Sequence, residues 1–225
     1  MIKFTIISAV PQLLESPLSH SILQRAQDKG ILEINLVNLH DFGVGKQNQI
    51  DDYQYGGGAG MVMMPEALAN CLKYLEQKGK FDEIIFLTPD GEQFKQQTAN
   101  TLSLKGNILL ICGHYKGIDE RFREKYVTKE ISIGDYVLSG GELGACVIVD
   151  AVARLVPGVL NNETSALTDS FQDDLLAPPV YTRPENWEDM KVPDVLLSGN
   201  FKKIDEWRTE KALERTQKRR PDLLK

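Results

Sequence analysis

The sequence predicts an α/β protein that has a mostly parallel sheet and a small second domain. Two observations support this class. From residue 2 to residue 155, apolar segments that suit strands alternate with segments that suit helices, which is the pattern of a sheet with helices on its faces. After Pro157 the character of the chain changes, because residues 158–184 are polar, contain prolines and are weakly periodic. We therefore expect three parts, namely an α/β domain over 1–160, an interdomain loop over 161–184 and a small helical domain over 185–225.

Five apolar segments predict the strands of the sheet. The second of them alternates between apolar and polar residues, as a half-buried strand does, whereas the third and fourth are apolar runs that suit buried strands. The third is expected to end in a turn at Thr88-Pro89-Asp90-Gly91. The five segments are residues 2–7, 31–39, 83–91, 107–113 and 128–134.

Five segments with helical character lie between and after these strands. Gly30 stops the first, and Pro65 opens the second at the first helical position, where proline is favoured. The last, from Glu142 to Leu155, is apolar nearly all round and is expected to be a buried helix. Residues 40–64 are expected to form a long loop. The expected helices cover residues 18–29, 65–79, 92–104, 118–126 and 142–155.

Composition excludes several classes of protein. The chain has 225 residues, of which 42 % are hydrophobic and 26 % charged, as in ordinary globular proteins. No apolar run approaches the roughly 20 residues that a membrane helix needs, and no small-residue cleavage site follows the apolar start. The cysteines Cys71, Cys112 and Cys146 lie in apolar runs, which favours buried thiols in a reducing compartment. We therefore expect a cytoplasmic protein without a membrane partner.

Charge is distributed unevenly along the chain. The net charge is −6, which by itself argues against a nucleic-acid partner. From Phe201 to Lys225, however, nine basic residues stand against five acidic ones, a net of +4, whereas the first 200 residues carry −10. This basic end, whose Ile204 and Trp207 are expected on one helical face, is either a contact for the phosphate backbone of a nucleic acid or an ordinary solvated helix face.

Three predicted strands end in glycine-bearing turns, at residues 88–91, 113–117 and 134–136. In open α/β sheets ligands bind at the carboxyl ends of strands, so the three turns are expected to converge on one pocket. Neither of the common phosphate-binding motifs, GxxxxGK[ST] and GxGxxG, occurs in the sequence. The three histidines have no metal-ligand spacing, so the sequence identifies no metal ligands.

The stretch ISIGDYVLSGGELGA, residues 131–145, narrows the kind of ligand. It has four glycines, no lysine or arginine, and two acidic residues, Asp135 and Glu142. A glycine loop without cations suits a ligand that is uncharged or positive where it touches the loop, because carboxylates nearby would repel a phosphate. S-adenosylmethionine is such a ligand, since it carries an adenine, a ribose and a sulfonium cation but no phosphate.

Seven stretches follow one another in the order of the motifs of a known family. They are YGGGAGMVMMPE (55–66), ICGHYKGIDER (111–121), ISIGDYVLSGGELGACVIVDAVARLVPGVL (131–160), DSF (169–171), PVYTRP (179–184), VPDVLLSGN (192–200) and RTQKRRPDLL (215–224). With these stretches the chain resembles the bacterial tRNA (guanine-N1)-methyltransferases, the TrmD family of the SPOUT class. The resemblance implies a SPOUT-type α/β fold with a deep trefoil knot near residues 85–140. It also implies S-adenosylmethionine-dependent methylation of ring N1 of the guanine 3′ of the anticodon in tRNA.

The resemblance implies roles for individual residues. Asp169 matches the family's general base, which accepts the proton of guanine N1, and Arg154 matches the guanidinium that stabilises the charge developing on guanine O6. The implied S-adenosylmethionine-binding residues are Leu87, Thr88, Pro89, Gly91, Gly113, Tyr115, Ile133, Gly134, Asp135, Tyr136, Val137, Leu138, Gly140 and Gly141. The implied tRNA-binding residues are Ser165, Arg183, Arg208, Arg215, Lys218, Arg219 and Arg220.

The resemblance further implies partners and cofactors. The relatives are obligate homodimers, in which the carboxyl domain of one subunit closes the cofactor site of the other. The family also requires Mg²⁺, and its nucleic-acid partner is tRNA rather than DNA.

Two features depart from the family pattern. Lys116 stands where the family commonly has Glu, which reverses a charge beside the expected cofactor. The chain also stops soon after RRPDLL, where many relatives continue with another helix. Two alternative functions stay open at this point. One is a SPOUT methyltransferase that acts on ribosomal RNA, and the other is a non-catalytic RNA-binding relative that kept the fold.

Overall fold

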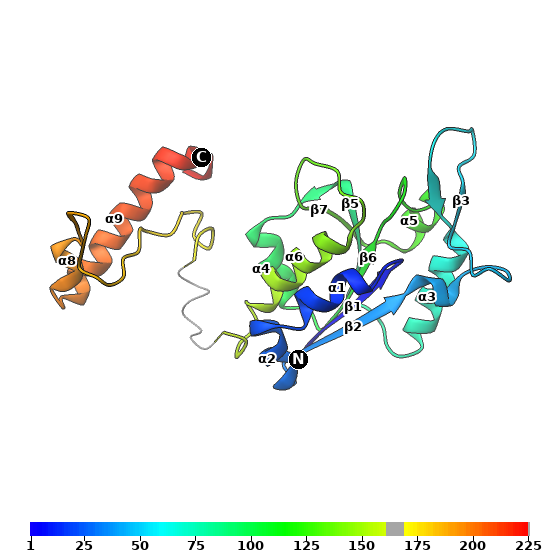
Figure 1. The fold of residues 1–225 in the computed structure, drawn as a ribbon, viewed down its shortest axis with the longest axis horizontal. Helices are drawn as coiled ribbons and strands as arrows, with labels where there is room; N and C mark the ends of the chain where they lie inside the picture. Colours follow the sequence, from blue (N-terminus) through cyan, green and yellow to red (C-terminus); the bar gives the residue numbers. More distant parts are fainter. Residues whose placement is uncertain (161–168, 225) are drawn as a thin grey trace. The chain divides into compact units, whose positions relative to one another are not determined.

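The structure, a computed structural model, describes residues 1–160 and 169–224 (Figure 1). The chain divides into two compact units, Met1–Asn162 and Glu163–Lys225. The first unit contains the α/β sheet and the second contains the long basic helix. None of the helices in the described ranges is long and apolar enough to cross a membrane.

In the described part of the first unit, five parallel strands form one sheet with the order β2-β1-β6-β5-β7. The predicted α/β class is therefore confirmed, and each predicted strand is present. The bounds are β1 Ile2–Ser8, β2 Leu32–Asn38, β5 Glu83–Gln93, β6 Asn107–Cys112 and β7 Lys129–Ser132.

Helices cover both faces of this sheet (Figure 1). They are α1 (Gln12–Leu18), α2 (Ser21–Asp28), the 3₁₀ helix η1 (Leu39–Phe42), α3 (Pro65–Glu76), α4 (Gln96–Ser103), α5 (Glu120–Tyr126) and α6 (Glu142–Ala153). Successive side chains of a strand point to opposite faces, so the sheet has a core on each side. Ile6 packs with the cluster that contains α1, α2, α4 and α6, whereas its neighbour Ile7 packs with the cluster that contains η1, α3 and α5.

The expected helix over 18–29 corresponds to α2, which is shorter and begins at Ser21 with a left-handed φ of 56°. A separate helix, α1, precedes it at Gln12–Leu18 and was not predicted. The expected loop over 40–64 is also wrong in part, since it contains η1 and an antiparallel hairpin of β3 (Asp51–Tyr53) and β4 (Met61–Met63). Three-residue strands are too short for their periodicity to be visible in a sequence.

Strand β5 continues beyond the expected turn at 88–91. Leu87 and Glu92 both pair with Ile131 of β7, so the four residues between them leave the ladder and form a bulge. Gly91 has a physical reason to be glycine here, because an added Cβ would lie 2.6 Å from the backbone carbonyl carbon of Glu130. Helix α4 consequently begins at Gln96 rather than at residue 92. The implied trefoil knot stays a prediction.

The second unit is mainly helical. Its elements are a small hairpin of β8 (Asn186–Trp187) and β9 (Met190–Lys191), helix α8 (Asp194–Leu197), helix α9 (Phe201–Arg219) and the 3₁₀ helix η2 (Pro221–Leu224). Ile204 is buried and Trp207 half-buried, as their shared helical face predicts. The buried hydroxyl of Thr216 accepts a hydrogen bond of 2.9 Å from the backbone N–H of Leu176, which ties the described part of residues 161–184 to α9.

Candidate functional site

A cavity of about 480 Å³ lies at the carboxyl ends of the neighbouring strands β5, β6 and β7. Its walls come from the bulge after Leu87, from the turn after Cys112 and from the segment after β7, with Glu120 and Arg123 added by α5. The expected convergence of three strand-end turns on one pocket is therefore confirmed. A pocket of this size and position suits a small-molecule ligand.

Twelve of the fourteen residues that the resemblance assigns to the cofactor line this cavity. They are Leu87, Thr88, Pro89, Gly113, Tyr115, Ile133, Gly134, Tyr136, Val137, Leu138, Gly140 and Gly141. The other two do not line it: Gly91 packs against the backbone of β7, and the side chain of Asp135 is exposed. Their binding roles stay predictions.

The glycines of the walls allow the loops to approach one another closely. A Cβ on Gly113 would lie 2.8 Å from the ring of Phe86, and one on Gly141 would lie 2.7 Å from the Cα of Cys112. The backbone N–H of Gly141 donates a 3.0 Å hydrogen bond to the carbonyl of Gly113. Gly113 and Gly141 therefore allow the two loops to pack closely on each other. This close packing accounts for both glycines without a bound phosphate.

The turn after β6 rests on the β3–β4 hairpin. The backbone N–H of Lys116 donates to the carbonyl of Met61, and the carbonyl of Gly117 accepts from the N–H of Met63, each at 3.0 Å. Lys116 lines the cavity, and its stem lies over Gly60, where an added Cβ would be only 2.9 Å from the lysine Cγ. Lys116 thus brings an exposed cation to the rim of the cavity, where the resemblance led us to expect a carboxylate.

Arg123 holds the β5 bulge from the side of α5. Its guanidinium bonds Asp90 at 2.7 Å and Glu130 at 2.6 Å, and its Cζ lies 5.5 Å from the centre of the Phe86 ring. The hydroxyl of Thr88 donates to the other oxygen of Asp90. The bond from Thr88 and then the bond from Arg123 lower the pKa of Asp90 below its ordinary value. The bulge is therefore fixed by charge-assisted hydrogen bonds at neutral pH.

The burial of the three cysteines agrees with the sequence prediction at two positions. Cys71 and Cys112 are buried, but Cys146 is only half-buried, so the expectation of three buried thiols is wrong for Cys146. Burial raises the pKa of Cys71 to about 12 and also raises the pKa of Cys112, whose second cause is the nearby carboxylate of Glu142. The raised pKa values favour the neutral thiol form of both side chains at physiological pH.

The two predicted catalytic residues lie in different units. Arg154 is half-buried and follows α6 in the first unit, where its backbone N–H donates to the carbonyl of Asp150 at 3.2 Å. Asp169 is exposed in the second unit, directly before a turn in which the N–H of Phe171 donates to the carbonyl of Leu175 at 2.7 Å.

The predicted tRNA-binding residues belong to the second unit, and Ser165 lies outside the described residues. Arg215 is half-buried, whereas Arg208 and Arg220 are exposed and have acidic neighbours, at 3.4 Å from Asp205 and 2.7 Å from Asp222. Arg183, Lys218 and Arg219 are exposed. The exposed cations among them are available to a phosphate backbone.

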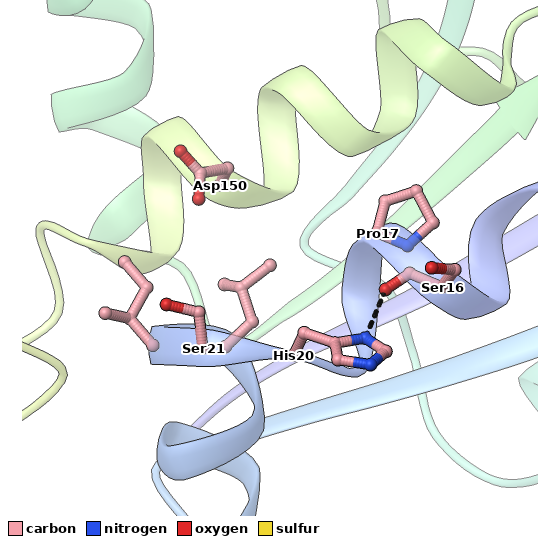
Figure 2. A pocket seen from close by; sticks show the side chains of 7 residues that line it. Ser16, Pro17, His20, Ser21 and Asp150 are labelled. Atoms are coloured by element: carbon pink, nitrogen blue, oxygen red, sulfur yellow. Dashed lines mark hydrogen bonds between the residues drawn. The ribbon is translucent and has the colours of Figure 1, made fainter.

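Figure 2 shows a second cavity, of about 410 Å³, which sequence reasoning missed. It lies between α1, α2 and α6, and Asp150 forms one side of it. The Nδ1–H of His20 donates to the carbonyl of Ser16 at 2.9 Å, which stabilises the break between α1 and α2. None of the predicted site residues lines this cavity.

Sequence reasoning also missed side chains that build the first cavity. Asp90, His114, Lys116 and Arg123 line it but were not assigned to the cofactor. Two of them, His114 and Lys116, lie inside the stretch ICGHYKGIDER, residues 111–121. The position of these two residues within that motif could have identified them as cavity residues. In residues 1–160 and 169–224, no group of three or more His, Cys, Asp or Glu side chains could hold a metal ion.

Comparisons with known proteins cover both units. A family model described as tRNA (Guanine-1)-methyltransferase TrmD matches residues 2–225. The chain is 60 % identical, over 222 residues, to a protein of Christiangramia forsetii named tRNA (guanine-N(1)-)-methyltransferase, and the match covers 99 % of this chain and 98 % of the relative. Proteins of the same name from Flavobacterium psychrophilum and Bacteroides fragilis are 55 % and 54 % identical, each match covering 99 % of both chains.

Proposed function

This chain belongs to the TrmD family of tRNA (guanine-1)-methyltransferases, and from that membership we propose that it methylates ring N1 of the guanine 3′ of the anticodon in tRNA. The methyl donor is S-adenosylmethionine. The observation that carries the proposal is the family match over the whole chain, together with the cavity in which twelve of the fourteen expected cofactor residues meet.

The chemistry of the cavity supports S-adenosylmethionine as its ligand. When bound there, this cofactor supplies an electrophilic methyl group on a sulfonium. Leu87, Ile133 and Leu138 offer apolar surface for the adenine, and the glycine loops offer backbone N–H and C=O groups to its edge. The lining carboxylate of Asp90 is bonded by Thr88 and Arg123, so its charge is balanced within the wall of the cavity.

In the proposed reaction, two side chains act on the guanine. Asp169 accepts the proton from N1, because a weakly acidic ring nitrogen must lose that proton to become a nucleophile. Arg154 donates hydrogen bonds to O6, where negative charge accumulates as the proton leaves. The position of both residues within matching motifs supports these roles.

The second unit is proposed to bind the tRNA. We assign the small helical domain to residues 185–225, the connecting segment to 161–184 and the cofactor domain to 1–160. The excess of cations from Phe201 to Lys225 supports contact with phosphates, and a tRNA substrate implies a cytoplasmic location. Mg²⁺ dependence is part of the same proposal, with no ligands assigned to it.

The proposal includes a homodimer. The sequence predicted a buried helix over 142–155, yet Leu143 and Val147, one turn apart on α6, are 58 % and 46 % exposed in the described chain. Leu13 of α1, which packs beside α6, is 54 % exposed. The buried face of α6 packs in the core of its own unit, and the exposed apolar stripe of Leu143 and Val147 is the surface that we propose a second copy of the chain covers.

The test of the proposed function is transfer of labelled methyl from S-adenosylmethionine to tRNA transcripts that carry either guanine or adenine next to the anticodon. We expect label on the guanine transcript alone, which would also establish that Lys116 is compatible with turnover. Label on ribosomal RNA transcripts instead would favour the ribosomal alternative. A folded protein that binds tRNA but transfers no label would favour the non-catalytic alternative.

A further inference from the structure

One buried carboxylate in the first unit has no role in the proposed reaction. Glu142 is 2 % exposed and stands in the first turn of α6. Its Oε1 accepts a hydrogen bond of 2.5 Å from the hydroxyl of Ser8, at the end of β1, and lies 2.7 Å from Nε2 of His114, in the turn after β6. Three segments that are far apart in the sequence therefore meet at one oxygen.

Two donors are directed at one carboxylate oxygen. Oε1 accepts from the hydroxyl of Ser8, and Nε2 of His114 lies within hydrogen-bond distance and donates in the tautomer that carries its hydrogen on that nitrogen. A carboxylate so deeply buried is costly unless its partners satisfy it, and here two donors and the N-terminus of α6 do so. Removing one donor would leave the charge uncompensated inside the protein.

The glycine loop is shaped around this pair. Gly140 has the carboxylate of Glu142 and the ring of His114 directly against it, and an added Cβ would lie 2.6 Å from Cε1 of His114. His114 and Gly140 also pair with each other as an isolated β-bridge. No residue with a side chain fits at position 140 without displacing the pair.

The pair joins two walls of the cavity without filling it. The cavity is lined by Gly113, His114, Gly140 and Gly141. Glu142 lies behind these residues and does not line the cavity. We propose that Glu142 is a positioning residue, which holds the turn after β6 and the loop before α6 together and thereby sets the affinity of the cavity for S-adenosylmethionine. This inference rests on the proposed function, because it assumes that the cavity binds this cofactor. Preorganised walls raise affinity because they need not be ordered when the ligand binds.

The experiment measures binding of S-adenosylhomocysteine to the full-length protein by calorimetry, with thermal unfolding of each variant in parallel. Glu142→Gln removes the charge at nearly constant shape, and His114→Leu removes the donor. His114→Gln keeps an N–H donor at similar reach and is the conservative rescue. Glu66→Gln is the matched control, because Glu66 is also in the first turn of a helix, α3, but is exposed.

We expect Glu142→Gln and His114→Leu each to weaken binding by about tenfold, since the first removes the charge that strengthens the hydrogen bond and the second removes the donor. His114→Gln should recover most of the affinity, and Glu66→Gln should stay within about twofold of the wild type. In steady-state methylation, the KM for S-adenosylmethionine should rise in the two weakened variants while the KM for tRNA does not.

Wild-type affinity in Glu142→Gln would overturn the positioning role. If that variant does not fold, His114→Leu decides, and a fall in melting temperature with unchanged affinity would overturn the role in favour of a purely structural contact. If the losses of affinity in Glu142→Gln and His114→Leu do not add in the variant that carries both changes, the two side chains act as one unit. A wild-type protein that binds no S-adenosylhomocysteine would instead overturn the proposed function, and with it the assignment of these walls to a cofactor.

Discussion

At the scale of single residues, the proposed chemistry depends on Asp169. Asp169→Asn keeps the shape of the side chain but removes its ability to accept the proton of guanine N1. We expect the rate of methyl transfer to fall by about 10²–10⁴-fold, as for the loss of a general base, with cofactor affinity unchanged. Single-turnover transfer and calorimetry measure the two quantities.

The neighbouring carboxylate provides the control for this variant. Asp173→Asn removes the same charge from an exposed position in the same segment and should leave the rate unchanged. A fully active Asp169→Asn protein would refute the assignment of the base.

At the scale of elements, the hydrogen bonds of Asp90 with Thr88 and Arg123 stabilise the bulge of β5 in a pH-dependent way. Asp90 has a pKa below its ordinary value because of Thr88 and Arg123, so its contribution to stability is present above the unfolded-state pKa of about 3.9. That contribution is lost as the pH falls through the lower, folded-state pKa. Asp90→Asn should therefore lower the melting temperature at pH 7 and make no difference at the most acidic pH at which the protein still folds.

The expected size of this effect is small. The side chain of Asp90 is 60 % exposed, and exposed ion pairs contribute no more than about 1 kcal/mol, which corresponds to about 2–4 °C. Glu92→Gln is the control, since Glu92 is 70 % exposed and only 4.0 Å from Lys129. An equal loss of stability in both variants at every pH would contradict a specific tether at Asp90.

At the scale of the whole molecule, α6 is expected to join two copies of the chain. Leu143→Glu places a charge in the exposed apolar stripe of α6, where burial in a dimer would leave it unpaired. We expect this variant to run as a monomer in size-exclusion chromatography with light scattering, and to lose methyl transfer if the partner closes the site. Leu104→Glu is the control, because Leu104 is 87 % exposed at the end of α4. A wild-type protein that is already monomeric would contradict the proposed dimer.

Local pattern was enough to predict the α/β class and the order of the strands along the chain. Strand and helix periods depend on neighbouring residues, so they are visible in any short window of sequence. The same windows missed helix α1 and the β3–β4 hairpin. There the local signal is weak, and the structure is stabilised by contacts with distant segments, such as the docking of Lys116 on Met61.

The sequence by itself determined the fold class, the family and the segments that surround the cavity, because each is encoded in contiguous residues. Only the tertiary structure decided which side chains hold that cavity in shape. Glu142 lies 28 residues from His114 and 134 from Ser8, and Asp90 lies 33 from Arg123. No periodicity relates such positions, since the path of the chain through the sheet sets which of them become neighbours.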